Sequence, residues 1–435
     1  MNTNSGNAKM TNVRYLILAM LFIVTTVNYA DRSTLAMTAP AIRKDLGLDP
    51  VSMGYIFSAF GWSYAAMQIP SGWLLDKYGS RLVYGVGLFF WSLFTALQGT
   101  VGFLTGASVF IVFFLYRLLM GGFEAPSFPA DARLAATWFP TNQRGLATSV
   151  FNSSQYFALA AFNPLMGWLA TVYGWQTVFY AMGCVGLVLS IYWFKVIRDP
   201  KDHPKVNQAE IDYIQAGGGL VDIGAKTEIK WDFVRQMLTS RMMIGIYIGQ
   251  FCINSISWFF LTWFPTYLVQ AKGMSILKVG IVASLPAICG FIGNLLSGAV
   301  SDWMLRRGIS LTVARKTPIV LGLIMSGSII IANYTSLEWV VIAVMSLAFF
   351  SKGVGALGWV VVGDTSPKEM VGLSGGIFNL ASNIASIATP IVIGYILQAT
   401  HSFNGALIYV GAMGICGAAS YLFIVPSIQR FELKK

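Results

Sequence analysis

The distribution of apolar residues is the feature that most restricts the fold of this chain. Hydropathy predicts twelve apolar stretches of about 20 residues, each long enough for a helix to cross the ~30 Å hydrocarbon core of a bilayer. Charged residues make up 11% of the 435 residues, whereas a soluble domain carries roughly 25%. We therefore predict an all-α polytopic membrane protein, because a soluble enzyme of this length would need a charged surface that the composition cannot supply.

The predicted transmembrane helices are spread over the whole sequence. They lie near residues 13–37, 51–75, 81–101, 105–129, 143–171, 175–196, 242–270, 276–301, 316–335, 338–363, 370–397 and 403–427. The first stretch has no small-residue cleavage site and continues into charged residues. We interpret it as a first transmembrane helix and not as a removable signal peptide.

Basic residues predict the orientation of the chain. Outside the predicted spans, only Arg43, Lys44, Lys272 and Lys278 fall in the loops on one side, and most of the 29 Lys and Arg residues belong to the other side. Because cytoplasmic loops are enriched in Lys and Arg, we expect both termini to be cytoplasmic. The same asymmetry accounts for the net charge of +11, so we expect the lipid bilayer and no nucleic acid as a partner.

Residues that could hold a metal ion are scattered. Cysteines and histidines occur singly, at Cys184, Cys252, His203, Cys289, His401 and Cys416, with no pair at metal-ligand spacing. The glycine pairs lie inside apolar stretches and form no phosphate-binding loop. We expect no metal, no cofactor and no catalytic residue.

One long polar segment divides the predicted spans six and six. Residues 198–241 are rich in charge and contain a run of three glycines. We interpret them as a cytoplasmic linker between an N-terminal six-helix bundle, residues 1–197, and a C-terminal six-helix bundle, residues 242–435. We expect the two bundles to be related by a pseudo-twofold axis and the protein to function as a monomer.

An internal repeat supports this division. The segment GLATSVFN at Gly145 is similar to GLSGGIFN at Gly372, an offset of 227 residues, and GWLLD at Gly72 is similar to GAVSD at Gly298, an offset of 226. Parallel repeats of this kind are typical of transporters whose two bundles rock around a site near the membrane midplane.

The loop after the second span resembles a family signature. In GWLLDKYGSR, the residues Gly72, Asp76 and Arg81 fit the signature loop of the major facilitator superfamily, and Asp302 holds the acidic position of the repeat. The resemblance implies a contact between an acid at a helix end and the neighbouring helix, which can break when the bundles move. A solvated charged turn without such a role is the alternative.

Five charged residues lie well inside the predicted spans: Asp31, Arg32, Arg117, Glu124 and Lys352. Each costs at least ~2.5 kcal/mol at bilayer depth, so each needs a partner, water or a function. Arg117 and Glu124 are seven residues apart and share a helix face. Two static ion pairs that lock the bundle are the alternative, although buried pairs often contribute no net stability.

The repeat places the intramembrane acids in one half. The positions that correspond to Asp31 and Glu124 in the second half are Trp258 and Ser351. We expect the first half to bind protons and the second half to recognise the substrate, through Lys352 and the polar or aromatic residues Gln250, Trp258, Trp359 and Asn379.

The neighbours Asp31 and Arg32, in the sequence NYADRST, suggest a coupling mechanism. Arg32 keeps its charge at any physiological pH. An ionised Asp31 can neutralise Arg32, whereas a protonated Asp31 leaves Arg32 free to bind a carboxylate. We therefore interpret Asp31 as a proton-coupling residue and Glu124, near Arg117, as a second one.

Longer segments resemble one branch of the superfamily. NYADRST, FSAFGW, RLLMGGFEAPSFP and FNSSQYF look like the anion:cation symporters, in particular bacterial sugar-acid carriers. The resemblance implies proton-driven uptake of an organic anion, with Asp31 and Glu124 as protonation sites, Arg32 as the carboxylate-binding residue and Arg117 as the charge partner of the acid. By the same resemblance the pocket is lined by Tyr29, Tyr64, Gln155, Gln250, Trp359 and Asn379.

Lys352 narrows the expected substrate. SLAFFSKGVGALGW resembles the glucarate and galactarate carriers, whereas carriers of monocarboxylic sugar acids have an uncharged residue at this position. A six-carbon dicarboxylic sugar acid could be held at one end by Arg32 and at the other by Lys352, with a bidentate contact favouring Arg. A monoacid would leave Lys352 unpaired.

Three other functions remain open on the sequence. The same fold could carry a galactonate, a hexuronate or another organic anion. It could export its substrate by antiport, since direction follows the gradients. A membrane sensor that binds the anion without moving it is a more remote alternative, because it would need a cytoplasmic signalling domain larger than the linker.

Overall fold

A computed structural model describes residues 10–219, 231–366 and 371–431, and this part of the chain consists of helices and loops without a strand. The first half forms α1 Val13–Leu46, α2 Pro50–Gln98, α3 Ala107–Glu124, α4 Ser127–Trp138, α5 Thr141–Tyr173 and α6 Trp175–Val196. The second half forms α9 Arg241–Thr262, α10 Phe264–Gln270, α11 Ile276–Val282, α12 Ser284–Arg306, α13 Leu311–Ser326, α14 Glu338–Val354, α15 Gly358–Thr365, α16 Val371–Thr400 and α17 Asn404–Ala419. The short helices α7 Gln208–Ala216 and α8 Trp231–Thr239 lie between them.

The predicted spans fall on these helices. Ten helical segments of the described chain are long and apolar enough to cross a membrane. One of them, Pro50–Phe103, holds two predicted spans, because Gly79 with φ 78° interrupts the helical backbone. The remaining predicted span is α5, which is not among the ten and contains several polar residues. The all-helical fold and the membrane-spanning character predicted from composition are therefore confirmed.

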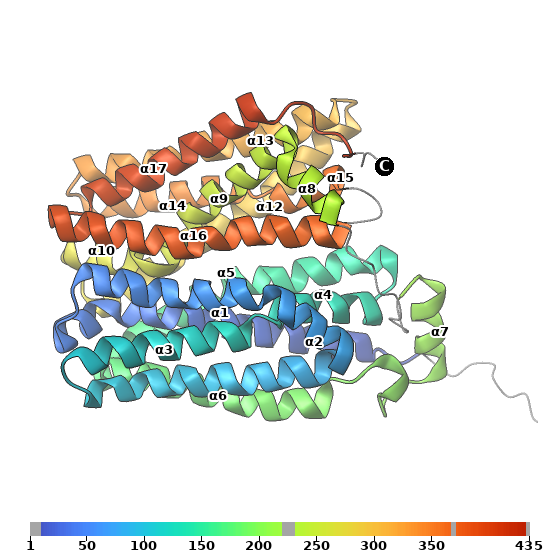
Figure 1. Ribbon diagram of the computed structural model, residues 1–435, viewed down its shortest axis with the longest axis horizontal. Helices are drawn as coiled ribbons and strands as arrows, with labels where there is room; N and C mark the ends of the chain where they lie inside the picture. Colours follow the sequence, from blue (N-terminus) through green and yellow to red (C-terminus); the bar gives the residue numbers. More distant parts are fainter. Residues whose placement is uncertain (1–9, 220–230, 367–370, 432–435) are drawn as a thin grey trace, which may run out of the picture.

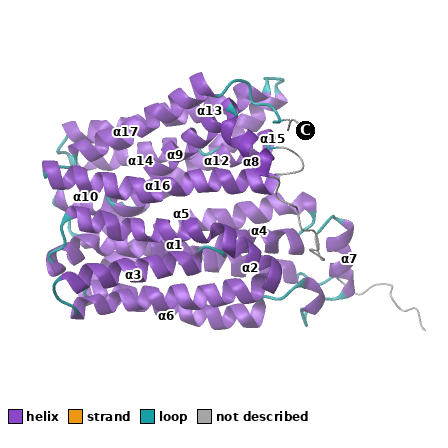
Figure 2. Cartoon of the chain, viewed as in Figure 1, coloured by secondary structure: helices purple, strands orange, loops and turns teal. Residues whose placement is uncertain are grey.

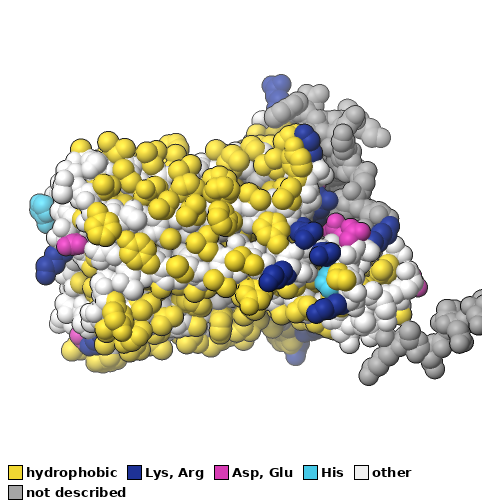
Figure 3. All heavy atoms as spheres, turned by 90° about the horizontal axis from the view of Figure 1, so that it is seen from below, with side chains coloured by type: hydrophobic (Ala, Val, Ile, Leu, Met, Phe, Trp, Pro, Cys, Tyr) yellow, Lys and Arg dark blue, Asp and Glu magenta, His cyan; other side chains and the backbone are white. Residues whose placement is uncertain are grey.

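The helices of each half lie together. Figure 1 shows α1, α3 and α6 on one side of the molecule and α9, α13, α14 and α17 on the other, with α5 and α16 between the outer layers. In Figure 3 hydrophobic side chains cover the middle of the molecule, and Lys and Arg gather mainly at one end. This belt is what lipid contact requires. The bundle boundaries at residues 197 and 242 remain a prediction.

The linker end is the end of the molecule that holds α7, α8 and the C-terminus (Figure 1), and we call the opposite end the far end. Part of the predicted linker is folded there. The buried side chain of Glu210 on α7 forms an ion pair of 3.0 Å with Arg14 and accepts the backbone N–H of Val13 at 3.0 Å. The linker helix α7 is thus fixed to the first turn of α1.

The two halves are in contact near the far end. A Cβ atom at Gly54 on α2 would lie 2.7 Å from the carbonyl oxygen of Pro390 on α16, and one at Gly280 on α11 would lie 2.7 Å from that of Asn163 on α5. The hydroxyls of Tyr55 and Tyr395 are 3.2 Å apart. Only glycine allows backbones to approach so closely.

Toward the linker end the same helices have open space beside their glycines. Apart from its sequence neighbours and the backbone of its own helix turn, nothing lies within 4 Å of a Cβ position at Gly72 on α2, Gly145 on α5, Gly298 on α12 or Gly376 on α16. The halves therefore touch closely near the far end, whereas these four glycines toward the linker end make no such contact.

Candidate substrate and proton site

A buried ion pair lies at the centre of the first half. The Nε atom of Arg32 on α1 donates to Oε1 of Glu124 at the end of α3 over 2.5 Å. Glu124 is fully buried and Arg32 is 8% exposed. The second carboxylate oxygen of Glu124 and Nη2 of Arg32 have no hydrogen-bond partner among the described residues, so both groups retain capacity for a proton or a ligand.

Aromatic rings surround the Arg32 guanidinium. Its central carbon lies 4.9 Å from the ring centroids of Tyr29 and Phe60, 5.1 Å from that of Tyr64 and 5.9 Å from that of Phe128. These rings come from α1, α2 and α4 and attract the cation through their faces. The rings of Tyr29 and Tyr64 are those expected from the sequence, whereas Phe60 and Phe128 were not predicted.

Asp31 does not neutralise Arg32 in this structure. Its Oδ2 accepts the indole N–H of Trp91 on α2 at 3.1 Å, and its Oδ1 has no partner among the described residues. Consecutive helical residues point about 100° apart. For this reason Asp31 faces α2 while Arg32 faces Glu124. The partner of Arg32 that the sequence suggested is thus corrected from Asp31 to Glu124.

Arg117 also differs from its expected arrangement. It shares a helix face with Glu124, but within the described residues it forms no ion pair. Its Nη1 lies 3.4 Å from the sulfur of Met120, and its guanidinium lies over the ring of Phe60 at 5.5 Å. Glu124 is engaged by Arg32, so Arg117 acts on it as a nearby charge and not as a direct partner.

Lys352 is the intramembrane cation that the sequence predicted for the second half. It lies in the last turn of α14 and has no carboxylate partner in the parts of the chain that the structure describes. Its Nζ lies 5.3 Å from the ring centroid of Phe349 and 6.0 Å from that of Tyr156. Tyr156 belongs to α5, so the ammonium lies at the contact between the halves.

The other predicted pocket residues are distributed over both halves. Asn379 on α16 donates to the side-chain oxygen of Gln68 on α2 at 3.3 Å, which joins the halves. Trp359 on α15 is 55% exposed and packs edge-on against Phe378. The side chain of Gln155 on α5 donates to the carbonyl of Asn152.

Gln250 is the last of the predicted pocket residues. It lies on α9, and a Cβ atom at Gly358 would lie 2.6 Å from its side-chain oxygen. Gln250 is therefore packed against the start of α15, one residue before Trp359.

The two signature loops hold ion pairs between neighbouring helices. Asp76 forms an ion pair of 3.0 Å with Arg133 on α4. In the repeat, Asp302 and Asp364 both contact Arg315 on α13, at 3.4 and 2.8 Å. Arg81 instead donates to the carbonyl of Phe194 on α6 at 2.9 Å. Gly72, at the start of the first signature loop, has open space beside its Cβ position.

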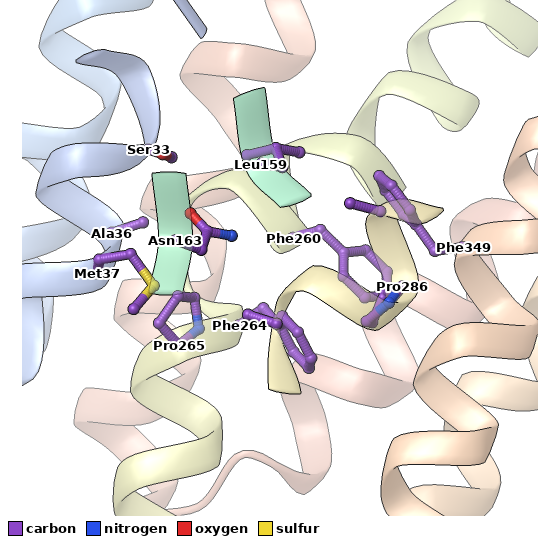
Figure 4. A pocket seen from close by; sticks show the side chains of 12 residues that line it. Ser33, Ala36, Met37, Leu159, Asn163, Phe260, Phe264, Pro265, Pro286 and Phe349 are labelled. Atoms are coloured by element: carbon purple, nitrogen blue, oxygen red, sulfur yellow. The ribbon is translucent and has the colours of Figure 1, made fainter. Parts of the chain in front are cut away.

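A pocket between the halves lies on the far side of this site (Figure 4). It is bounded by Ser33 next to Arg32, by Phe349 one turn before Lys352, and by Phe260, Phe264 and Asn163. None of the residues predicted to bind substrate lines it. The pocket marks the space between the charged site and the closed far end.

The structure adds a buried acid, Asp131, that lies outside the predicted spans. Asp131 on α4 is fully buried, and its Oδ2 accepts the hydroxyl of Thr25 at 3.1 Å. Its Oδ1 has no partner among the described residues. The helix pair α3–α4 continues to Trp138, well past the predicted end of the span at residue 129. A longer predicted span would have included Asp131 among the intramembrane charges.

Two helical halves that touch closely near one end and an interior site of opposed charges are typical of membrane transporters of the alternating-access type. The sequence matches the model of the Major Facilitator Superfamily over residues 21–314, and the chain belongs to this family. No group of three or more His, Cys, Asp or Glu residues in the described chain could hold a metal ion.

Several curated proteins are similar over nearly their full length. The "Probable galactarate/D-glucarate transporter GudP" of Bacillus subtilis is 56% identical, with 98% of this chain and 95% of that protein covered. The "Probable galactarate/D-glucarate transporter GarP" of Escherichia coli is 53% identical over all of both chains. A "D-galactonate transporter" of Escherichia coli is 41% identical, with 97% and 98% covered.

Solved structures share the fold. A D-xylose–proton symporter superimposes with a TM-score of 0.72 at 15% identity, with 96% of this chain and 99% of that chain covered. An inward-facing bacterial homologue of the human lysosomal transporter Spinster gives 0.71 at 16% identity, with 96% of each chain covered. At these identities the likeness concerns the fold alone.

Proposed function

We propose that this protein is a proton-coupled symporter that imports a six-carbon dicarboxylic sugar acid, D-glucarate or galactarate, by alternating access. Relatives that are 52–56% identical carry the names of galactarate/D-glucarate transporters. The observation that carries the proposal is a site with one Arg paired to an internal Glu and one Lys without a carboxylate partner among the described residues.

The Arg32–Glu124 pair is the proposed coupling device. While Glu124 is ionised it occupies the guanidinium. When Glu124 takes up a proton, the ion pair is lost and Arg32 needs another anion, because an unpaired charge at this depth is costly. A substrate carboxylate can then bind Arg32 in bidentate geometry. Release reverses the order, since loss of the proton restores the internal pair. Asp31 is the second proposed protonation site.

Lys352 is proposed to hold the second carboxylate. A monocarboxylic sugar acid would leave this ammonium without an anion, so the carrier should discriminate against it. The rings of Tyr29, Tyr64 and Trp359 can pack against the C–H groups of the sugar acid. Gln155, Gln250 and Asn379 are proposed to hydrogen-bond its hydroxyls.

The proposed setting is a bacterial inner membrane with both termini in the cytoplasm and a functional monomer. The linker end then faces the cytoplasm, and the open space beside Gly72, Gly145, Gly298 and Gly376 toward that end supports an inward-open carrier. Substrate and protons would leave on this side.

Uptake by proteoliposomes tests the proposal. We expect labelled galactarate or glucarate to accumulate only with an inward proton gradient, and a proton ionophore to abolish accumulation. Competition by unlabelled hexarates, galactonate and hexuronates would identify the substrate class. Accumulation that is indifferent to the pH gradient would contradict proton coupling.

Lys352→Asn separates the two substrate classes. If Lys352 binds the second carboxylate, this variant should lose roughly tenfold or more in apparent affinity for galactarate and little for galactonate. Equal losses for both compounds would reject the two-ended binding. A carrier of monocarboxylic sugar acids is the second candidate, supported by the 41% identity to a D-galactonate transporter.

A further inference from the structure

Tyr156 lies next to the ammonium of Lys352 but belongs to the opposite half. It is on α5, and its ring centroid is 6.0 Å from Nζ of Lys352 on α14. The same ring packs at 5.8 Å against Phe291 on α12. Tyr156 therefore reaches from the first half into a site formed by two helices of the second.

The hydroxyl of Tyr156 is available to a ligand. It makes no hydrogen bond to a described residue, although Tyr156 is only 6% exposed. The hydroxyls of Tyr84, Tyr247 and Tyr267 are sealed inside the protein without partners, whereas that of Tyr156 is not among these sealed atoms. The Lys352 ammonium is likewise not sealed. Both polar groups are therefore free to donate a hydrogen bond to a ligand.

The surroundings of these two groups are otherwise apolar. Phe349 lies under the ammonium at 5.3 Å, and Phe291 lies beside the phenol ring. No carboxylate of a described residue forms an ion pair with Lys352. A phenol hydroxyl can donate a hydrogen bond, and an ammonium has three donors. Donors from these two neighbouring residues, with apolar walls around them, suit an anion with two oxygens.

Helix packing connects this site with the Arg32 region. Arg32 and Tyr29, whose ring lies 4.9 Å from the Arg32 guanidinium, are on α1, and α1 packs against α5, the helix that carries Tyr156. A diacid held at one end by Arg32 could then extend toward the Tyr156 hydroxyl and the Lys352 ammonium.

We propose that Tyr156 is a further substrate-binding residue, whose hydroxyl donates to the same carboxylate of the diacid that Lys352 binds. This inference rests on the proposed transport of a dicarboxylic sugar acid and adds a residue from the first half to its second carboxylate site. The far carboxylate then joins the two halves, since one donor comes from α5 and the other from α14. A monoacid lacks this contact and leaves the two halves unconnected at this point.

Tyr156→Phe is the direct test, because it keeps the ring and its packing and removes only the hydroxyl. We expect the apparent KM for galactarate to rise roughly tenfold, as for loss of a hydrogen bond to a charged group, while inhibition by galactonate changes less than twofold. Tyr247→Phe on α9 is the matched control, since it removes a hydroxyl that is buried without a hydrogen-bond partner among the described residues, and it should leave both values unchanged.

A double-mutant cycle with Lys352→Asn tests whether the two residues hold the same carboxylate. In the Lys352→Asn background, Tyr156→Phe should change galactarate affinity less than twofold. An undiminished effect there would overturn the shared site, and so would equal effects on diacid and monoacid or no effect in the wild-type background. Absence of hexarate uptake by the unmodified protein would instead contradict the proposed function itself.

Discussion

At the scale of single residues, the arrangement of the buried charges departs from what their sequence spacing suggested. Asp31 and Arg32 are adjacent, but their side chains turn to different helices, and Arg32 meets Glu124 from a segment 92 residues away. Spacing along one helix predicts which residues share a face. It does not predict which of several acids a cation reaches across the bundle.

Glu124→Gln removes the ionisable partner of Arg32. We expect net proton-driven uptake to fall at least tenfold, while exchange of internal for external substrate is retained, because exchange does not require Glu124 to lose its proton. The measurement compares uptake and counterflow in the same proteoliposomes. Asp31→Asn should also abolish accumulation. Unchanged net uptake in the Gln variant would contradict a coupling role for Glu124.

Asp131 should behave differently from Glu124. It has no cationic partner among the described residues and only the Thr25 hydroxyl as a donor, so an ionised carboxylate at this depth would be very costly. We expect Asp131 to be neutral throughout the cycle. Asp131→Asn should therefore keep transport within about twofold of wild type. Asp131→Leu should reduce thermal stability, because it leaves the Thr25 hydroxyl unpaired. A loss of coupling in the Asn variant would show that Asp131 titrates.

At the scale of elements, the linker contributes a helix to the first half. The carboxylate of Glu210 on α7 accepts a hydrogen bond from the Thr11 hydroxyl at 2.7 Å. It also accepts the backbone N–H groups of Val13 and Arg14 at 3.0 and 3.2 Å. The first N–H groups of a helix have no partner within the helix. A carboxylate supplied by the linker satisfies two of them at the start of α1 and is favoured there by the helix dipole.

Glu210→Ala should destabilise this docking. It leaves the buried Arg14 and two N–H groups without partners, at a cost of about 1–3 kcal/mol. Glu338→Ala is the matched control, since its ion pair with Lys278 is exposed and such pairs contribute about 0–1 kcal/mol. Thermal unfolding of the two variants in detergent should show a clear decrease for the first and little change for the second. Equal decreases would contradict the role of burial.

At the scale of the whole molecule, glycines determine how closely the two halves approach. Gly54 and Gly280 lie at tight backbone contacts near the far end, while Gly72 and Gly298 face open space toward the linker end. The second pair belongs to the repeated signature segments, so the corresponding close contacts are expected when the molecule closes on that side.

Substitutions at the two ends should shift the conformation in opposite directions. A side chain at Gly54 would clash with the Pro390 carbonyl, so Gly54→Val should disfavour the state seen here. A side chain at Gly298 would meet no neighbour here, so Gly298→Val should disfavour only a state that is closed at the linker end. Spin-label distances across the far end should lengthen in the first variant and stay short in the second. Identical distance distributions would show that these contacts do not control the equilibrium.

The sequence alone determined the class of this protein. Its apolar stretches, low charge and repeated signature segments predicted a membrane-spanning helical fold, and each apolar stretch can be read from a window of about 20 residues. The sequence also indicated Asp31, Arg32, Arg117, Glu124 and Lys352, because a charge within an apolar stretch stands out without any knowledge of its neighbours, but it missed Asp131.

The tertiary structure decided how those residues are connected. The Arg32–Glu124 pair, the burial of Asp131 and the approach of Tyr156 to Lys352 each join segments that are far apart in the chain. Such contacts depend on how the helices are rotated and packed, which hydropathy and spacing do not specify. The chemistry available to the site therefore follows from the sequence, and the partner of each charge follows from the packing.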